Sequence, residues 1–142
     1  MAAQPATVIL DNEAVAALSD IRHPKHRALL PYLEGIAQRR ARDTSLRVLV
    51  PVAVRVEAGW DRTRPKAAVV NRVSGARDVP LTGDAADTAQ QLRGATGVSV
   101  VDATVGEAAD AAAKPVVILT SDADDMRALA ERIDGEVRVQ RV

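Results

Sequence analysis

Short apolar runs alternate with amphipathic segments along this chain. Continuous apolar runs that end in polar residues are typical of buried strands, and residues 7–10, 48–50 and 116–119 fit that description. Shorter or alternating runs give further candidates for strands or extended links, at residues 79–81, 98–101 and 137–139. The pattern therefore predicts a sheet whose strands are spread over the whole chain.

Helical spacing of apolar residues fills the intervals between these runs. The predicted helices cover residues 12–18, 24–42, 51–60, 65–73, 82–93, 102–113 and 122–133. The longest carries Leu29, Leu33 and Ile36 on one face and ends in arginines, which complement the helix dipole. Alternation of strands and helices favours a parallel sheet with helices on both faces. The predicted fold class is α/β, in a single domain that covers residues 1–142.

Composition restricts both the core and the chemistry. The chain has no Phe, one Tyr and one Trp, so Val, Leu, Ile and Ala must fill its core, which suits a parallel sheet. The absence of Cys excludes disulfides, zinc–thiolate sites and a thiol nucleophile. No apolar run approaches membrane-spanning length, and the first seven residues lack the features of a signal peptide. We therefore expect no membrane association and a cytoplasmic location.

The charge is balanced overall but uneven along the chain. Lys plus Arg and Asp plus Glu both number 19, which argues against a protein that binds nucleic acid by bulk charge. Residues 55–77 nevertheless contain six basic side chains against two acidic ones, and residues 102–125 contain six acidic side chains against one basic. A basic flank beside an acidic pocket suits a metal-dependent enzyme that acts on a phosphodiester. For most of these charges taken singly, a solvated helix face is the simpler interpretation.

Four acidic residues lie at element ends or in apolar surroundings. Asp11, Asp102 and Asp122 end or follow apolar runs, and Glu57 lies in a valine-rich segment. Carboxylates close to a core are costly unless their charge is compensated, and Mg²⁺ and Mn²⁺ prefer oxygen ligands. Ligands of parallel sheets bind beyond the carboxyl ends of the strands. The pattern therefore favours a divalent metal site and hydrolytic chemistry.

Simpler interpretations of the same acids stay open at this point. Asp102 and Asp122 could cap helices by accepting hydrogen bonds from first-turn N–H groups, and Asp125 could support Asp122 in that role. Glu57 could be an exposed helix residue. Capping and metal binding are compatible roles for one carboxylate.

The order and spacing of the motifs resemble the PIN domain, and most closely the VapC-type toxins of bacterial toxin–antitoxin pairs. Four segments carry the resemblance, which covers nearly the whole chain: Val8-Ile9-Leu10-Asp11, Val50-Pro51-Val52-Ala53-Val54-Arg55-Val56-Glu57, Val100-Val101-Asp102-Ala103-Thr104-Val105-Gly106 and Leu119-Thr120-Ser121-Asp122-Ala123-Asp124-Asp125. The resemblance implies a PIN-like three-layer sandwich with a central parallel sheet of about five strands.

The resemblance also implies an activity and a set of residues. The four acids of the family fall on Asp11, Glu57, Asp102 and Asp122, with Asp125 as a further candidate ligand. The implied function is a Mg²⁺- or Mn²⁺-dependent endoribonuclease that uses metal-activated water and is held inactive by a cognate antitoxin, in a protein that forms homodimers. The candidate residues for binding the RNA substrate are Arg55, Arg62, Arg64 and Lys66.

The chain departs from the family at three positions. Asn12 replaces the Thr or Ser that usually follows the first Asp, and its amide oxygen could still orient a metal-bound water. Met126 stands where Phe is common and can fill the same apolar space. Trp60 takes the place of a small or basic residue, where it either lines a groove or packs in the core.

Two other functions are compatible with an α/β scaffold. One is a PIN-like module that binds a partner or RNA without cutting it. The other is a receiver-type phosphoacceptor domain, which also clusters Asp residues and has a Lys-Pro pair. Lys114 and Pro115 precede a predicted strand, whereas a receiver has this pair after one, and the paired acids of a receiver N-terminus are missing.

Overall fold

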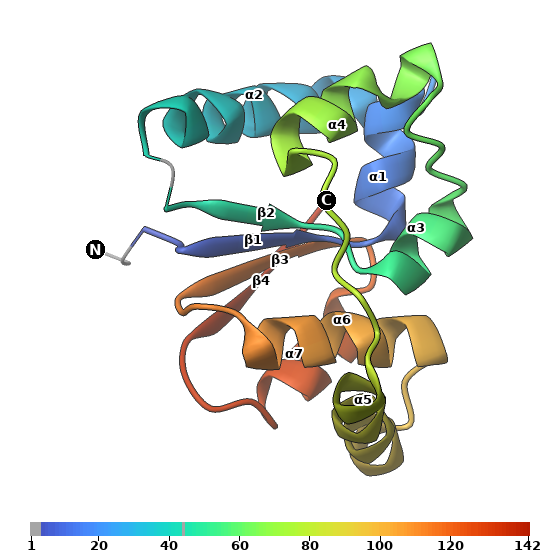
Figure 1. Cartoon of the computed structure of the whole chain (residues 1–142), viewed down its shortest axis with the longest axis vertical. Coiled ribbons are helices and arrows are strands. Elements are labelled where there is room, and N and C mark those ends of the chain that lie inside the picture. Colours follow the sequence, from blue (N-terminus) through green and yellow to red (C-terminus); the bar gives the residue numbers. More distant parts are fainter. Residues whose placement is uncertain (1–3, 44) are drawn as a thin grey trace.

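A computed structural model describes residues 4–43 and 45–142 and has a four-stranded parallel sheet at its centre (Figure 1). The strand order is β2-β1-β3-β4, and every neighbouring pair is parallel. The strands are β1 (Thr7–Leu10), β2 (Arg47–Leu49), β3 (Val116–Thr120) and β4 (Val137–Arg141). The sequence prediction of a parallel sheet is confirmed.

Helices cover both faces of this sheet, as predicted. They are α1 (Asn12–Ser19), α2 (His26–Arg42), α3 (Val52–Ala58), the 3₁₀ turn η1 (Pro65–Ala67), α4 (Ala68–Ser74), α5 (Gly83–Thr96), α6 (Val100–Ala111) and α7 (Ala123–Ala130). In Figure 1, α1, α2 and α4 lie on one side of the sheet, and α6 and α7 lie on the other with α5 outside them. Within the described part of the chain, every helix is too short or too polar to pass through a lipid bilayer.

The described residues form four strands rather than about five. Residues 79–81 contribute an isolated bridge, in which Val79 pairs with Pro51 and accepts a hydrogen bond of 3.2 Å from the Val52 N–H. Proline has no N–H to donate. Pro51 is itself one of the bridged residues and Pro80 follows the other, so the ladder does not extend. The candidate fifth strand is therefore reduced to one pair.

Residues 98–101 are also not a strand. The Ser99 hydroxyl accepts a hydrogen bond of 3.1 Å from the Asp102 N–H, and this cap starts α6 at Val100. Asp102 therefore lies in the first turn of a helix, instead of ending a strand or capping the helix itself. A capping Ser can start a helix even when two valines follow it, because it satisfies an N–H that has no partner within the helix.

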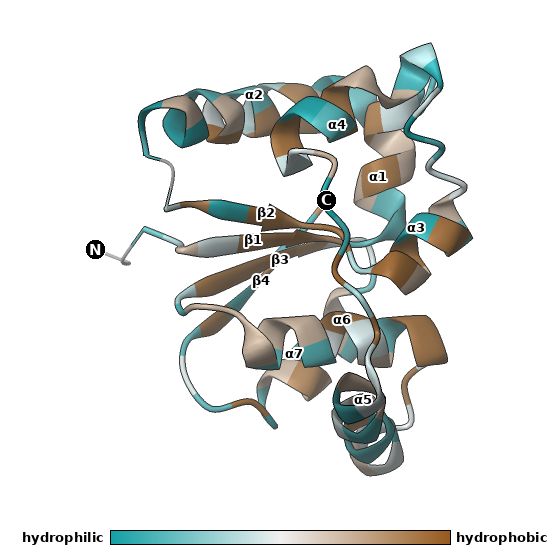
Figure 2. Ribbon diagram, viewed as in Figure 1, coloured by the Kyte–Doolittle hydropathy of each residue, from teal (hydrophilic) through white to brown (hydrophobic). Residues whose placement is uncertain are grey.

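The core consists of aliphatic side chains, as the composition predicts (Figure 2). All residues of β1 and β3 are buried, and each large aliphatic side chain that leaves water contributes about 1.5–3 kcal/mol. Met126 is fully buried in α7, as its proposed substitution for Phe requires. Trp60 is 6% exposed and its indole N–H donates a hydrogen bond of 3.0 Å to Asn71, so it packs in the core.

Candidate metal centre

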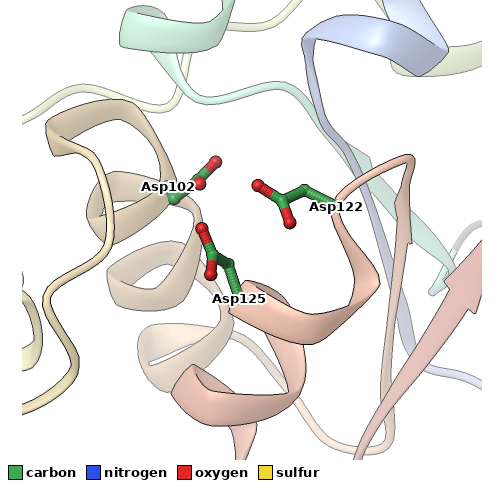
Figure 3. Close-up of side chains that lie close together, drawn as sticks. All are labelled: Asp102, Asp122 and Asp125. Atoms are coloured by element: carbon green, nitrogen blue, oxygen red, sulfur yellow. The ribbon is translucent and has the colours of Figure 1, made fainter.

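Three aspartates from two helices meet at the carboxyl edge of the sheet. Asp102 comes from the first turn of α6, and Asp122 and Asp125 come from the start of α7, directly after β3. One carboxylate oxygen from each lies within 4.8 Å of the others, and Figure 3 shows the three side chains facing a shared space. Three carboxylates at this separation can hold one hard divalent cation.

Asp11 lies beside this cluster and joins two strand ends. Its Oδ1 accepts a hydrogen bond of 3.0 Å from the Ala14 N–H, so it caps α1, and its Oδ2 accepts one of 3.3 Å from the Ser121 N–H. The residue is 4% exposed. Burial raises the pKa of Asp11 above its usual value, while hydrogen bonds, first among them that of the Thr120 hydroxyl, partly offset the rise.

Like charges and burial act together on Asp102. Burial, followed by the charges of Asp122, Asp125 and Asp11, raises the pKa of Asp102 to about 6, although a hydrogen bond with Ser99 acts against the rise. Partial desolvation and the charge of Asp122 also raise the pKa of Asp125. The four aspartates therefore share one electrostatic site, and this site favours either protons or a cation.

Capping explains these acids only in part. Ser99 rather than Asp102 caps α6, and Asp122 occupies the N-cap position of α7 without a side-chain capping bond in the described structure. The Asp122 N–H instead donates a hydrogen bond of 2.9 Å to the Thr120 hydroxyl. Capping of the helix N-termini therefore does not account for the carboxylates of Asp102 and Asp122.

Glu57 does not belong to the group of three. It is exposed on α3, and its Oε1 accepts a hydrogen bond of 2.9 Å from the Asn12 side-chain amide. Asn12 directly follows Asp11, so this bond links Glu57 to the start of α1 beside the acidic site.

Two polar residues at the site were not singled out from the sequence as site residues. Thr120 ends β3, bonds to Asp11 and accepts the Asp122 N–H, and Ser99 fixes the start of α6. The signal for Thr120 was present, because a hydroxyl in an apolar run directly before Ser121 and Asp122 needs a partner when it is buried. For Ser99 the signal was its place three residues before Asp102.

The candidate RNA-binding residues lie on α3 and in the segment that follows it, and most of them are already paired. Arg55 and Arg62 both contact Asp78, at 3.0 Å and 3.3 Å, and Arg64 contacts Asp61 at 3.4 Å. Lys66 is exposed in η1. Arg55 and Arg62 thus hold the segment that follows α4, as in the simpler interpretation of this basic run.

The geometry argues against a receiver site. The Lys114 amine donates hydrogen bonds of 2.8 Å to the carbonyls of Asp110 and Ala112, at the C-terminus of α6. Lys114 precedes β3, whereas Asp122 follows it, so the lysine and the acidic cluster lie at opposite ends of this strand. A receiver needs its lysine beside its acids.

The chemistry of the donor set fits the implied metal. All candidate ligands are carboxylate oxygens, which suit Mg²⁺ and Mn²⁺ and do not favour softer metals. Asp102, Asp122 and Asp125 provide a set whose mutual repulsion a divalent cation would relieve.

Comparison with known proteins supports the fold. No family model matches the sequence, and no curated protein matches it either. The structure resembles that of VapBC2 from Rickettsia felis, bound to a promoter DNA fragment, with a TM-score of 0.60 and 13% identity over 96% of this chain and 98% of that chain. It also resembles FitAcB from Neisseria gonorrhoeae, with a TM-score of 0.58 and 15% identity over 92% of this chain and 96% of that one.

A third solved structure, PAE2754 from Pyrobaculum aerophilum, has a TM-score of 0.51 and 17% identity over 93% of this chain and 83% of that one. Similarities at these identities establish the arrangement of the chain rather than its activity. The protein therefore has a mixed α/β fold similar to that of these solved structures, with four parallel strands in the described residues.

Proposed function

We propose that this protein is a Mg²⁺- or Mn²⁺-dependent endoribonuclease and the toxin of a type II toxin–antitoxin pair. The observation that carries the proposal is the convergence of Asp11, Asp102, Asp122 and Asp125 on one edge of a PIN-like sheet. The proposal places the protein in the cytoplasm, where RNA is abundant.

Each acidic residue has a distinct part in this proposal. Asp102, Asp122 and Asp125 would hold the cation. Asp11 would complete the site from the end of β1, because its charge already acts on Asp102. Glu57 would face the substrate from α3, held by Asn12. A bound cation of this kind supplies Lewis acidity to a phosphodiester and lowers the pKa of coordinated water.

Substitution of Asp11 by Asn tests the activity. We expect Asp11→Asn to abolish Mn²⁺-dependent cleavage of a mixed RNA pool, because it removes the buried negative charge while keeping the size and capping capacity of the side chain. Asp124→Asn is the matched control, since Asp124 is exposed, pairs with Arg127 and lies directly before Asp125. Circular dichroism would verify the fold of both variants. Undiminished cleavage by Asp11→Asn would end the proposal.

Titration with Mn²⁺ distinguishes this enzyme from a PIN-like module that binds without cutting. Isothermal titration calorimetry should detect binding to the unaltered protein, and Asp122→Asn should weaken it at least tenfold. A protein that binds RNA but no Mn²⁺ would favour the non-catalytic module.

We further propose a cognate antitoxin as a partner, because the solved structures with this fold include the VapBC2 and FitAB complexes. An antitoxin could place a basic side chain against the acidic cluster and neutralise it in place of the cation. Added Mn²⁺ should then compete with a neighbouring-gene antitoxin in a pull-down, and the absence of such competition would contradict this mode of inhibition.

Homodimer formation is also proposed, through a surface made by three exposed apolar side chains. Val100 and Leu81 line one depression, and Val100 is 59% exposed. Val56 is exposed on α3, which packs against α6, the helix that carries Val100. Light scattering after gel filtration should give a dimer for the unaltered chain and a monomer for Val100→Asp. A monomeric unaltered chain would refute the dimer without affecting the nuclease proposal.

A further inference from the structure

We propose that a pocket between α2 and the ends of β3 and β4 binds one base of an RNA strand whose phosphate lies at the acidic cluster. This inference rests on the proposed nuclease function. The pocket has a volume of about 260 Å³ and is separate from the four aspartates. Its walls include Lys25, Leu29, Tyr32, Leu119, Gln140 and Arg141.

The pocket offers a base a flat apolar environment. Leu29 and Leu119 are buried and form its floor. Tyr32, the one tyrosine of the chain, lies on the rim with 45% of its surface exposed. An aromatic ring beside an apolar floor is the arrangement on which bases stack in proteins that bind single-stranded RNA. A single ring suits one base rather than a continuous stacked strand.

The polar groups of the pocket suit a nucleotide. The Gln140 amide nitrogen donates a hydrogen bond of 3.2 Å to the Arg141 carbonyl, and its amide oxygen is a hydrogen-bond acceptor. Arg141 is exposed and makes no ion pair within residues 4–43 and 45–142. Lys25 contacts Glu13 at 3.5 Å with 37% of its side chain exposed. Arg141 thus gives the pocket a positive charge with no ion-pair partner among the described residues, and this charge is complementary to phosphate.

The pocket and the acidic cluster lie on opposite sides of the same strand end. Consecutive strand residues point to opposite faces, and Leu119 lines the pocket whereas Thr120 bonds to Asp11 and Asp122. The Leu119 carbonyl accepts the Asp11 N–H at 3.1 Å, and the Val142 N–H donates to the Thr120 carbonyl at 2.9 Å. An RNA strand that bends around this end of β3 can therefore place a phosphate at the cluster and a neighbouring base in the pocket.

Charge favours RNA over an apolar peptide as the occupant. An acidic cluster alone repels a polyanion, so the substrate needs cationic groups close to it. Arg55 and Arg62 are both held by Asp78. Arg141 has no ion-pair partner among the described residues, so it can contact a phosphate. Arg141 and Lys25 line the pocket, at the same end of β3 as the cluster.

The test measures RNA affinity without cleavage. A fluorescent single-stranded RNA would be titrated, with Mg²⁺ present, against Asp11→Asn protein that also carries a pocket variant. We expect Tyr32→Leu to weaken binding about tenfold and Tyr32→Phe to change it less than twofold, since phenylalanine keeps the stacking face. Arg141→Gln should lower the slope of log affinity against log salt concentration by about one.

Two controls separate the pocket from the rest of the surface. Ile21→Ala removes an apolar side chain that is 82% exposed outside the pocket, and Arg132→Gln removes an exposed charge in the turn after α7. Neither should change the affinity for RNA beyond twofold.

The outcomes also distinguish this inference from the nuclease proposal. In active protein, Tyr32→Leu should raise KM about tenfold with little change in kcat. If Tyr32→Leu binds and cleaves RNA like the unaltered chain, the base pocket is refuted and the nuclease proposal stands. If Tyr32→Leu leaves RNA affinity unchanged but alters the oligomeric state, the pocket contacts a second copy of the chain instead. If the unaltered protein binds no RNA, both proposals fail.

Discussion

The side-chain amide of Asn12 donates a hydrogen bond of 2.9 Å to Oε1 of Glu57. Asn12 is the first residue of α1 and directly follows Asp11, and Glu57 lies in the last turn of α3. The bond therefore links α3 to the start of α1 next to Asp11. The Asn12 amide has N–H groups that can donate to a carboxylate, which an aliphatic side chain lacks. Asn12 therefore holds Glu57, the one acidic candidate residue that is not an aspartate.

The first prediction concerns this bond. Asn12→Ala should lower Mn²⁺-dependent RNA cleavage about tenfold, because residues that orient the groups around a metal have effects of about 10- to 100-fold. Asn12→Ser, which keeps a shorter donor, should lose less. If Asn12 acts through Glu57, the double variant with Glu57→Gln should be no slower than Glu57→Gln alone. Additive losses in this double-mutant cycle would contradict the positioning role.

The second prediction concerns pH and metal affinity. The pKa of Asp102 is raised to about 6 by burial and by the neighbouring aspartates, and a protonated carboxyl binds a cation poorly. The apparent affinity for Mn²⁺ should be constant above pH 7 and fall by about tenfold per pH unit below about pH 6. Calorimetry between pH 5.0 and 7.5 measures it. A profile without this decline would contradict the shared electrostatic site.

The third prediction concerns the stability of the metal-free fold. Because the pKa of Asp102 is higher in the folded chain than its usual 3.8, the folded state binds more protons than the unfolded state between these values. Stability should therefore fall as pH rises from about 4 to about 6 and stay reduced above that. The raised pKa values of Asp11 and Asp125 act in the same direction.

Urea unfolding in EDTA at pH 5 and pH 7 tests this expectation. Asp102→Asn should raise the unfolding midpoint at pH 7 and flatten its pH dependence, because it removes the repelled charge. Added Mn²⁺ should stabilise the unaltered chain at pH 7 and have much less effect on the variant. Asp124→Asn, which removes an exposed charge, should change neither result.

The fourth prediction concerns the packing of α6 against its neighbours. A Cβ atom at Gly106 would lie 3.0 Å from Leu129 Cδ2 and 3.3 Å from Leu92 Cδ1. Gly106→Ala should therefore destabilise the protein by about 1–3 kcal/mol through overpacking. Gly94→Ala in α5 is the matched control, since a Cβ there meets nothing within 4 Å, and it should stabilise the helix by about 0.5–1 kcal/mol. Thermal unfolding of both variants measures the difference, and equal effects would contradict the close contact.

Much of the fold was predictable because its strongest signals are local. The buried strands β1 and β3 are unbroken aliphatic runs, and strands of this kind need helices on both faces. The start of α6 was misplaced because residues 98–101 have strand-like composition, and the Ser99 cap overrides that preference. A fifth strand was overpredicted at residues 79–81. Val79 pairs only with Pro51 and is followed by Pro80, and neither proline has an N–H with which to extend the ladder.

The candidate site was predictable only in the part that follows from strand ends. Asp11 and Asp122 follow β1 and β3, which pair in register as neighbours, so their proximity follows from the sheet. The approach of Asp102 depends on how α6 packs, and no spacing in the sequence encodes that distance. The engagement of Arg55 and Arg62 with Asp78 likewise depended on the path of the chain after α4.

The sequence by itself determined the α/β class, the aliphatic core and the placement of two aspartates at adjacent strand ends, because periodicity and burial act over a few residues at a time. Only the tertiary structure decided that Asp102 and Asp125 join Asp122, that Glu57 is held by Asn12, and that Tyr32 and Gln140 share a pocket. These relations depend on how whole helices pack across the sheet, and that packing is set by the fit of the entire core rather than by any single segment.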